Sequence, residues 1–352
     1  LCKPPRDLMG RAPWEQSAIE HCRPYFQQVL EQNPQIKVIM PLGNSAMHYL
    51  LQQKGISNFH GTAHWHAVLE KWIVPSFHPS YLMRGNWREI QTSRFDFGVA
   101  ADIAAKCMSS PPELAHKRLP VDYLQEPSAT SGWEWAYAYK AAWQADPELP
   151  LAADIENPYG SPDEEDAEDD VDMTIDRISF AYGSHIAMTM PWEGPYIEIA
   201  KWLLGQPGEK WWWNGDRHDG PRLRAANAPW INSVDIQELW HFMYPDLPKK
   251  LGYVAPFFTD GLPWKHLKGV EEPFYSCEDS ARLWAIGTTL KKAIIEAGRW
   301  PSFQAEILDI NKRTALMSAN GIAIDDKLRL SMVTEQHEFK DKAHIEVQAL
   351  IP

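Results

Sequence analysis

Two acidic residues, Asp154 and Glu156, end an apolar segment of the chain, residues 149–156. The segment is typical of a buried strand, and side chains at positions i and i+2 of a strand point to the same face of a sheet. Two carboxylates held on one face repel each other unless a cation binds between them. Hard divalent cations such as Mg²⁺ prefer carboxylate oxygens as ligands. The pair therefore predicts a metal site at the end of this strand.

Two further acids occur where they could complete such a site. Asp219 follows another predicted strand, residues 210–213, and Asp279 lies at the start of a predicted helix. Tyr275 precedes Asp279 by four residues, a spacing that places both side chains on one face of a helix. A pair of Mg²⁺ or Mn²⁺ ions held by such carboxylates can hydrolyse a phosphodiester, because the ions activate the attacking water and stabilise the leaving oxygen. The residues thus predict a two-metal phosphodiester hydrolase.

Three short segments follow one another along the chain: Asp154-Ile155-Glu156, Asn214-Gly215-Asp216-Arg217-His218-Asp219 and Tyr275-Ser276-Cys277-Glu278-Asp279. Their order and spacing resemble the three exonuclease motifs in the proofreading domains of family A (DNA polymerase I-like) DNA polymerases. The resemblance is to the DEDD class of these exonucleases that carries a Tyr in the third motif. It implies a 3′→5′ exonuclease domain that acts on single-stranded 3′ ends of DNA.

The resemblance also assigns roles to particular residues. It implies that the two metals are held by four acids, Asp154, Glu156, Asp219 and Asp279. Tyr275 would orient the attacking water, and Asn214 would help to position the 3′-terminal nucleotide. His218 stands where the family usually has another aromatic residue, so whether it holds the terminal nucleotide is left open.

Three other acids lie in or near the motifs. Asp235, within Ser233-Val234-Asp235-Ile236-Gln237, resembles the acid that follows the second motif in that family. Asp216 and Glu278 lie inside the motifs, but nothing in their spacing gives them a metal. We expect both of these side chains to be exposed to solvent.

The segments around the motifs predict a mixed sheet. Periodicity and turn residues predict a strand that ends at the first two acids, a hairpin, an amphipathic helix, another strand and a long helix, over residues 149–156, 175–190, 196–204, 210–213 and 280–297. Three strands followed by a helix, a strand and more helices fit an α/β, ribonuclease-H-like fold. The run Trp211-Trp212-Trp213 is expected to fill the core strand and its edges, with base stacking by one of the three as the alternative.

The first hundred residues predict a smaller α/β domain. Strands are expected over 36–40 and 71–75, and helices over 46–52 and 87–105. Because the order is strand, helix, strand, helix, we expect the two strands to be parallel.

Four segments of this domain carry a second resemblance: Cys2-Lys3-Pro4-Pro5-Arg6-Asp7, His21-Cys22-Arg23-Pro24-Tyr25, Val38-Ile39-Met40-Pro41-Leu42-Gly43-Asn44-Ser45-Ala46 and Val74-Pro75-Ser76-Phe77-His78-Pro79-Ser80-Tyr81-Leu82. They resemble the C-terminal half of family 4-type uracil-DNA glycosylases. In that family, Cys2 and Cys22 would be two of four ligands of an iron–sulfur cluster. The other pair and the Gly-rich motif that activates water are missing from this sequence, so we do not expect an intact cluster.

The histidines of this domain allow two interpretations each. By the resemblance, His78 would contact a uracil flipped out of the DNA stack, or stabilise charge as the glycosidic bond breaks. The favoured alternative is a structural loop histidine that has lost its catalytic partners. His60, His64 and His66 could bind Zn²⁺, but a surface loop is the favoured interpretation.

Composition narrows the class of protein. The net charge is −13, and eight carboxylates in residues 163–172 predict a solvated acidic insert. A uniformly basic nucleic-acid binder is therefore excluded, although local basic patches are not. Four scattered cysteines argue against a disulfide scaffold and favour a reducing, cytosolic setting. The resemblance to family A polymerases implies the cytoplasm of a bacterial cell or of a phage-infected host. We find neither a membrane-length apolar stretch nor a signal peptide.

Residues 306–325 resemble the segment that leads from the exonuclease into the thumb of family A polymerases, with a plain helical hairpin as the alternative. No palm or fingers signature follows, and the sequence has no initiator Met. We therefore expect a piece of a longer polymerase whose polymerase domain is its partner downstream. The predicted parts are a partial glycosylase-like domain, a Ser- and Pro-rich linker, the exonuclease domain and a helical tail, over residues 1–108, 109–135, 136–300 and 301–352.

The leading functional prediction is the proofreading exonuclease portion of a phage or bacterial family A DNA polymerase. Two alternatives remain. One is a uracil-DNA glycosylase in which the exonuclease is vestigial. The other is a non-catalytic DNA-binding module that recruits a polymerase.

Overall fold

The computed structural model describes residues 12–116, 118–158, 173–321 and 323–350. Cys2 and the acidic insert 163–172 lie outside these ranges. The chain divides into two compact units, Leu1–Ile307 and Leu308–Pro352. The larger unit contains two sheets, and the smaller unit is helical.

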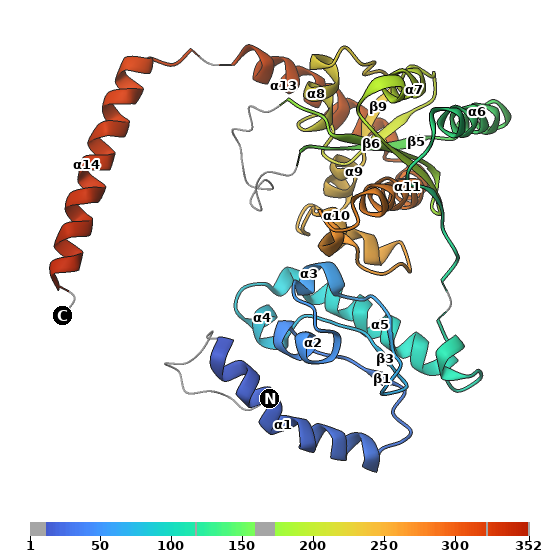
Figure 1. The fold of residues 1–352 in the computed structure, drawn as a ribbon, viewed down its shortest axis with the longest axis vertical. Helices are drawn as coiled ribbons and strands as arrows, with labels where there is room; N and C mark the ends of the chain where they lie inside the picture. The colour runs from blue at the N-terminus through green and yellow to red at the C-terminus, as the bar shows by residue number, and fades with distance from the viewer. Residues whose placement is uncertain (1–11, 117, 159–172, 322, 351–352) are drawn as a thin grey trace. The chain divides into compact units, whose positions relative to one another are not determined.

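The first sheet has three short strands in the order β1-β3-β2. Strand β1 (Val38–Ile39) is parallel to β3 (Lys71–Ile73), which confirms the expected parallel pair. Strand β2 (His64–His66) is antiparallel to β3 and was not expected from the sequence. Five helices accompany this sheet (Figure 1): α1 (Ala12–Gln32), α2 (Asn44–Leu51), α3 (Ile56–Phe59), α4 (Pro79–Met83) and α5 (Ile90–Lys106).

A buried polar network ties this sheet to the rest of the larger unit. The His60 ring is fully buried, so the expectation of a surface loop is wrong at this position. Its Nδ1 lies 2.9 Å from Asp96 Oδ1, and its Nε2 lies 2.9 Å from the Tyr253 carbonyl oxygen. The Ser76 hydroxyl donates to the other Asp96 oxygen at 2.6 Å. Tyr253 belongs to a helix far along the chain, α10 (Leu251–Val254). These buried hydrogen bonds therefore join the first sheet to the later part of the larger unit in a dry interior.

The second sheet has six strands in the order β4-β7-β6-β5-β8-β9. Strand β6 runs antiparallel to both neighbours, whereas the β5–β8, β8–β9 and β4–β7 pairs are parallel. This is the mixed sheet predicted from the sequence, hairpin included. The strands are β4 (Asp122–Leu124), β5 (Leu151–Glu156), β6 (Arg177–Gly183), β7 (Ile186–Pro191), β8 (Lys210–Trp212) and β9 (Ser233–Asp235). Strand β4 lies within the segment predicted as a linker, and β9 was not predicted.

Helices cover both faces of the second sheet (Figure 1). Helices α6 (Ala129–Ala145) and α7 (Gly194–Leu204) bury apolar side chains against one face, and α11 (Glu272–Glu296) packs on the other. The alternation of a strand separates Trp211 from Trp212. Trp212 joins the core with α6 and α7, whereas the Trp211 ring lies against Gly287 of α11, where a Cβ would have no room. Both rings are buried, as predicted.

The remaining helices of the larger unit connect and flank the sheet: α8 (Asp219–Ala225), α9 (Ile236–Met243), α10 and α12 (Trp300–Phe303). The smaller unit contains α13 (Asp309–Asn320) and α14 (Asp326–Leu350), which confirms the expected helical tail. None of the helices formed by the described residues has both the length and the apolar character needed to cross a membrane.

Replacing Tyr253 by Phe tests how the two sheets are joined. The Tyr253 hydroxyl donates to Glu89 Oε2 at 2.6 Å and lies 2.6 Å from Thr92 Oγ1, and both partners are buried. Losing the hydroxyl leaves them short of a partner, so we expect the free energy of unfolding to fall by about 1–3 kcal/mol in chemical denaturation. Tyr244→Phe is the matched control because Tyr244 is exposed. Equal stability of the two variants would contradict the expectation.

Candidate functional site

The end of β5 positions the first two acids. Leu151, Ala153 and Ile155 point into the core shared with α6 and α7. Because side chains alternate along a strand, Asp154 and Glu156 point to the opposite face, where α11 packs. The predicted placement of both carboxylates on one face is therefore present.

Helix α11 lies close to this face because the residues it presents there are small. Ser276 and Ser280 are fully buried, and Thr189 of β7 donates a hydrogen bond to the Ser276 hydroxyl at 3.2 Å. The first turns of the helix bring Asp279 towards the end of β5. Carboxylate oxygens of Asp154, Glu156 and Asp279 lie within 4.8 Å of one another. Three of the four predicted metal ligands thus form one cluster.

The protonation of this cluster reflects its crowding. Burial, and then the neighbouring charges of Glu156, Asp279 and Asp219, hold the pKa of Asp154 well above its usual range. Burial and Asp279 likewise raise the pKa of Glu156 to about 8. Burial is the larger cause of both shifts, and the repulsion between carboxylates that the sequence suggested adds to it.

The donor set fits a divalent metal. The three ligand groups are hard carboxylate oxygens, which suit Mg²⁺ or Mn²⁺. Glu156 Oε1 is buried and has no hydrogen-bond partner among the described residues. A buried acceptor without a partner is costly, and a cation placed between the carboxylates would satisfy it.

Three residues at the cluster were missed in the sequence. The Trp264 indole N–H donates to Asp279 Oδ1 at 2.6 Å, and Lys265 Nζ lies 2.9 Å from the same oxygen. Lys268 Nζ lies 3.8 Å from Glu156 Oε2. Although burial lowers the pKa of Lys265, Asp279 and Tyr275 outweigh it and raise that pKa well above its usual value. The sequence signal was the basic segment just before the third motif, residues 264–268, which had been given no role.

Tyr275 and Asp279 lie on one face of α11, as their spacing predicts, and both are buried. Lys265 Nζ donates to the Tyr275 hydroxyl oxygen at 3.0 Å. Burial and the nearby Asp279 carboxylate raise the pKa of Tyr275. The phenol therefore keeps its proton and can donate a hydrogen bond towards the carboxylates.

Asp219 lies beside the cluster and its carboxylate is held by the backbone. Asp219 is buried, and its Oδ1 accepts a hydrogen bond from the Ile155 N–H at 3.1 Å. The other oxygen lies 3.5 Å from His218 Nδ1. His218 is part-exposed, and its Nε2 accepts from the Asn157 side-chain amide at 3.1 Å. The second motif thus meets the end of β5 through Asp219 and His218.

Asn214 starts the turn between β8 and α8. Its backbone is left-handed, with φ of 64°, and its N–H donates to Asp235 Oδ1 at 3.1 Å. Asp235 also caps α9 by accepting from the Gln237 N–H at 3.0 Å. Burial, and then Asp216, raise the pKa of Asp235 to about 7. Asp235 therefore shapes the loop of the second motif from outside the carboxylate cluster.

The expectation that Glu278 is exposed is wrong. Only 3% of it is accessible, because residue 278 of α11 points into the protein rather than to solvent. Arg282 Nε donates to Glu278 Oε2 at 2.7 Å, and the Tyr123 hydroxyl donates to Oε1 at 3.3 Å. Asp216 is half-buried rather than exposed. Sequence spacing could not show this, because β4, which carries Tyr123, was not predicted.

His78 lies apart from the carboxylates, at the start of α4 and just beyond β3. The side chain is exposed, and its Nδ1 accepts hydrogen bonds from the Ser80 N–H and hydroxyl at 3.0 and 2.8 Å. The ring proton therefore sits on Nε2. Gly43 lies beside it with φ of 88°, and a Cβ there would come within 3.1 Å of His78 Cβ. Cys22, the second predicted cluster ligand, is half-buried.

Comparison with known proteins assigns the first part of the chain. The model of the uracil DNA glycosylase superfamily matches residues 1–96, so this part is a glycosylase-superfamily-like domain. No curated protein matches the chain.

Two solved structures are similar to the chain at low identity. Escherichia coli RNase D, an exoribonuclease involved in structured RNA processing, is 14% identical with a TM-score of 0.40, over 55% of this chain and 50% of that one. The catalytic core of RRP6 from Trypanosoma brucei is 14% identical with a TM-score of 0.39, over 57% and 53%. The match thus spans about half the length of these structures, and a likeness of this degree concerns the fold alone.

The raised carboxyl pKa values predict a pH-dependent stability. The folded protein keeps a proton on Glu156 up to pH of about 8, whereas the unfolded chain releases it near 4.5. Without divalent ions, the free energy of unfolding should therefore fall as pH rises through this window. Denaturation in EDTA at several pH values measures the slope.

Glu156→Gln is the matched variant, because it keeps the shape of the side chain and removes the titration. The free energy of unfolding of this variant should fall less steeply with pH than that of the wild type. Added Mg²⁺ should stabilise the wild type more at pH 8 than at pH 5, because the carboxylates are then free to bind it. The same pH dependence of stability in both proteins would contradict the raised pKa of Glu156 in the carboxylate cluster.

Proposed function

We propose that the chain carries a metal-dependent 3′→5′ exonuclease that hydrolyses phosphodiesters at nucleic-acid ends. The observation that carries the proposal is the cluster of Asp154, Glu156 and Asp279, whose oxygens lie within 4.8 Å at the end of a central strand. Divalent ions held there would supply Lewis-acid catalysis and a bound water of lowered pKa. The cluster by itself supports only a metal-dependent hydrolase. The 3′→5′ direction of the proposed exonuclease is supported by the order of the three sequence motifs.

The chain's own groups support the chemistry around that centre. Trp264 and Lys265 hold the Asp279 carboxylate by hydrogen bonds of 2.6 and 2.9–3.0 Å, so its oxygens are oriented before any ligand binds. Tyr275 accepts from Lys265 and has its own O–H left to donate to a water or a phosphate oxygen. It is a positioning group and not a base, since its pKa is raised.

The substrate we propose is a single-stranded DNA 3′ end, presented by the polymerase domain of a family A enzyme of which this chain is a part. The motif resemblance supports this choice. We propose that Asn214 and His218 contact the terminal nucleotide, because both belong to the loop that leads to Asp219, whose Oδ1 accepts a hydrogen bond from the Ile155 N–H of β5. His218 is part-exposed and can reach a ligand without rearrangement of the core.

Replacing Asp154 and Glu156 together by Ala should reduce hydrolysis of a 3′-labelled single-stranded oligonucleotide in Mg²⁺ by about a thousandfold or more, because two ligands of the centre are lost. Gel analysis of nucleotide release measures this. Circular dichroism checks that the fold is retained.

The matched control is Asp102→Ala with Glu113→Ala, which removes two exposed carboxylates far from the cluster in sequence. Its activity should equal that of the wild type. Retained hydrolysis in a folded Asp154→Ala, Glu156→Ala protein would refute the proposal, as would a wild type that releases no nucleotide in Mg²⁺ or Mn²⁺.

A second candidate function, uracil recognition by the first domain, is favoured by the family match over residues 1–96. His78 adds to it, because its Nε2–H points away from its Ser80 contacts and remains able to donate to a base carbonyl. The helix start that carries His78 follows β3 of a parallel pair, the edge where α/β sheets commonly bind ligands.

Uracil recognition predicts tighter binding of uracil-containing than of thymine-containing DNA. We expect a difference of about tenfold that His78→Ala removes, because one hydrogen bond to the base is lost. Fluorescence anisotropy in EDTA measures the affinities without digestion. The control is His344→Ala, at an exposed position in the tail. Equal affinities of the wild type for the two DNAs would remove this candidate.

A further inference from the structure

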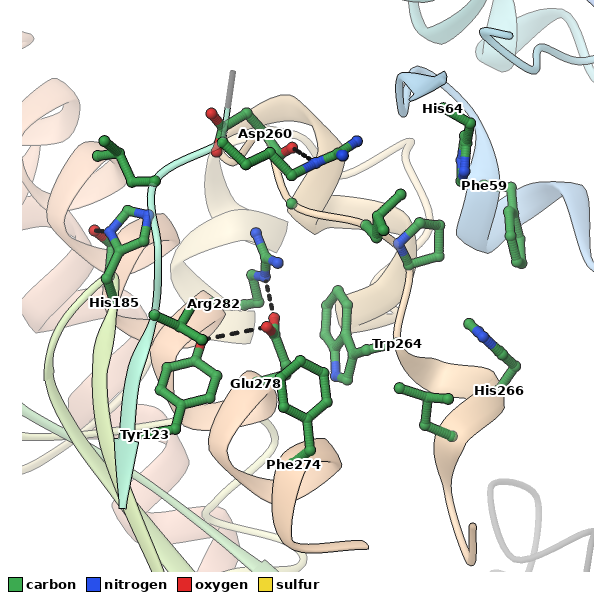
Figure 2. A pocket seen from close by; sticks show the side chains of 18 of the residues that line it. Phe59, His64, Tyr123, His185, Asp260, Trp264, His266, Phe274, Glu278 and Arg282 are labelled. Carbon is green, nitrogen blue, oxygen red and sulfur yellow. Dashed lines mark hydrogen bonds and ion pairs between the residues drawn. The ribbon is translucent and has the colours of Figure 1, made fainter. Parts of the chain in front are cut away.

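A cavity of about 430 Å³ lies between the glycosylase-like domain and the exonuclease sheet (Figure 2). Phe59 and His64 line it from the first domain, and Tyr123, Phe274 and Arg282 line it from the second. Neither the proposed hydrolysis at the carboxylates nor the proposed uracil contact of His78 uses this cavity. Its volume is in the range of pockets that bind small organic ligands.

The cavity is a neighbour of the carboxylate cluster and is separated from it by one side chain. Trp264 lines the cavity, and its indole N–H donates to Asp279 of the cluster. Glu278 and Asp279 are consecutive on α11, so their side chains diverge: Glu278 faces the cavity and Asp279 faces the cluster. A molecule in the cavity would therefore lie across the Trp264 ring from the proposed reaction centre.

Two guanidinium groups reach this cavity. Arg282 is 9% exposed and pairs with Glu278 through Nε alone. Among the described residues, no partner accepts from its two terminal nitrogens, which lie where a Cβ of Gly261 would be. Arg118 also lines the cavity and donates from Nε to the Asp260 carbonyl oxygen at 2.9 Å. Its Nη2 donates to the Ala63 carbonyl oxygen. Because Asp260 and Gly261 are consecutive, and Arg282 lies against Gly261, the two guanidinium groups lie near each other. Burial lowers the pKa of Arg118, Asp260 opposes the shift, and Arg282 adds to it.

The remaining lining is aromatic. Phe274 and Tyr123 pack with ring centroids 5.8 Å apart, and Phe59 and His64 are stacked at 5.9 Å. Burial, and then Arg118, lower the pKa of His64 to about 4, so its ring is neutral and adds no charge. The charged groups that face the cavity are thus two arginines and the buried Glu278, with Asp260 exposed at the rim.

We propose that this cavity binds a nucleotide, with its phosphate between Arg118 and Arg282 and its base against the aromatic rings. Guanidinium groups bind phosphate oxygens in a bidentate geometry, and aromatic side chains stack on bases of any sequence. An unpaired guanidinium fork beside Glu278 is satisfied by a phosphate and would be left unsatisfied by an apolar ligand. The choice of a nucleotide over other aromatic phosphates rests on the proposed exonuclease, which would release nucleoside monophosphates one side chain away.

Two sources can supply this ligand, a free nucleoside monophosphate and a nucleotide within a DNA strand. Isothermal titration calorimetry of the full chain in EDTA distinguishes them, with dTMP, thymidine and a single-stranded oligonucleotide as separate titrants. EDTA prevents hydrolysis, so this result does not depend on whether the carboxylates are catalytic. Failure of the exonuclease would be seen separately, as a wild type inactive in Mg²⁺.

Two single variants, Arg118→Gln and Phe274→Leu, change part-exposed positions. A double variant, Arg282→Gln with Glu278→Gln, removes both charges of a buried ion pair, so that neither is left without its partner. Arg94→Gln, at an exposed arginine, is the control. We expect dTMP to bind more tightly than thymidine, and each pocket variant to weaken dTMP by about tenfold or more while the control does not. If only the oligonucleotide binds and the same variants weaken it, the ligand is a strand. Absence of binding, equal binding of thymidine and dTMP, or affinities unchanged in all pocket variants would overturn the proposal.

Discussion

The repulsion among three carboxylates between β5 and α11 is the constraint on which the rest of this structure depends. Asp154, Glu156 and Asp279 are brought within 4.8 Å by strand alternation on one side and by the first turns of a helix on the other. Such a collection of negative charge opposes folding unless protons or cations compensate it. Burial and this repulsion raise the pKa of Asp154 and of Glu156, which favours compensation by protons. A site that holds protons in this way is also ready to exchange them for a divalent ion.

Lysine side chains supply part of the compensation. Lys265 contacts both Asp279 and Tyr275, and Lys268 approaches Glu156. The segment that carries them also carries Trp264, which orients Asp279 from one side and lines the neighbouring cavity on the other. One short loop therefore links the charge balance of the cluster to the shape of the space beside it. This link between the cluster and the cavity is local, because it is made by the hydrogen bond from Trp264 to Asp279.

The two domains of the larger unit are also joined by polar groups that are buried. His60, Asp96 and Tyr253 form hydrogen bonds that would leave unsatisfied atoms in a dry interior if the domains separated. The arginine-lined cavity exists because this junction holds Phe59 and His64 opposite Phe274 and Arg282 (Figure 2). The glycosylase-like domain is thus part of the environment of the six-stranded sheet.

The sequence by itself determined the elements and the carboxylates. Apolar runs, a Gly-Ser turn and i, i+2 or i, i+4 spacings are local properties, so the hairpin, the mixed sheet and the shared face of Asp154 and Glu156 could be predicted. Strands β2, β4 and β9 could not be predicted, because none of them contains three consecutive apolar residues like those at 38–40, 72–74 and 211–213, which mark the equally short β1, β3 and β8. The exposure expected for Glu278 and for His60 was wrong because hydrogen-bond partners of both, Tyr123 and Tyr253, come from distant segments. Only the tertiary structure placed Lys265 and Trp264 on Asp279 and brought Arg118 and Arg282 to one cavity, because contacts between residues far apart in the chain are decided by packing and not by spacing.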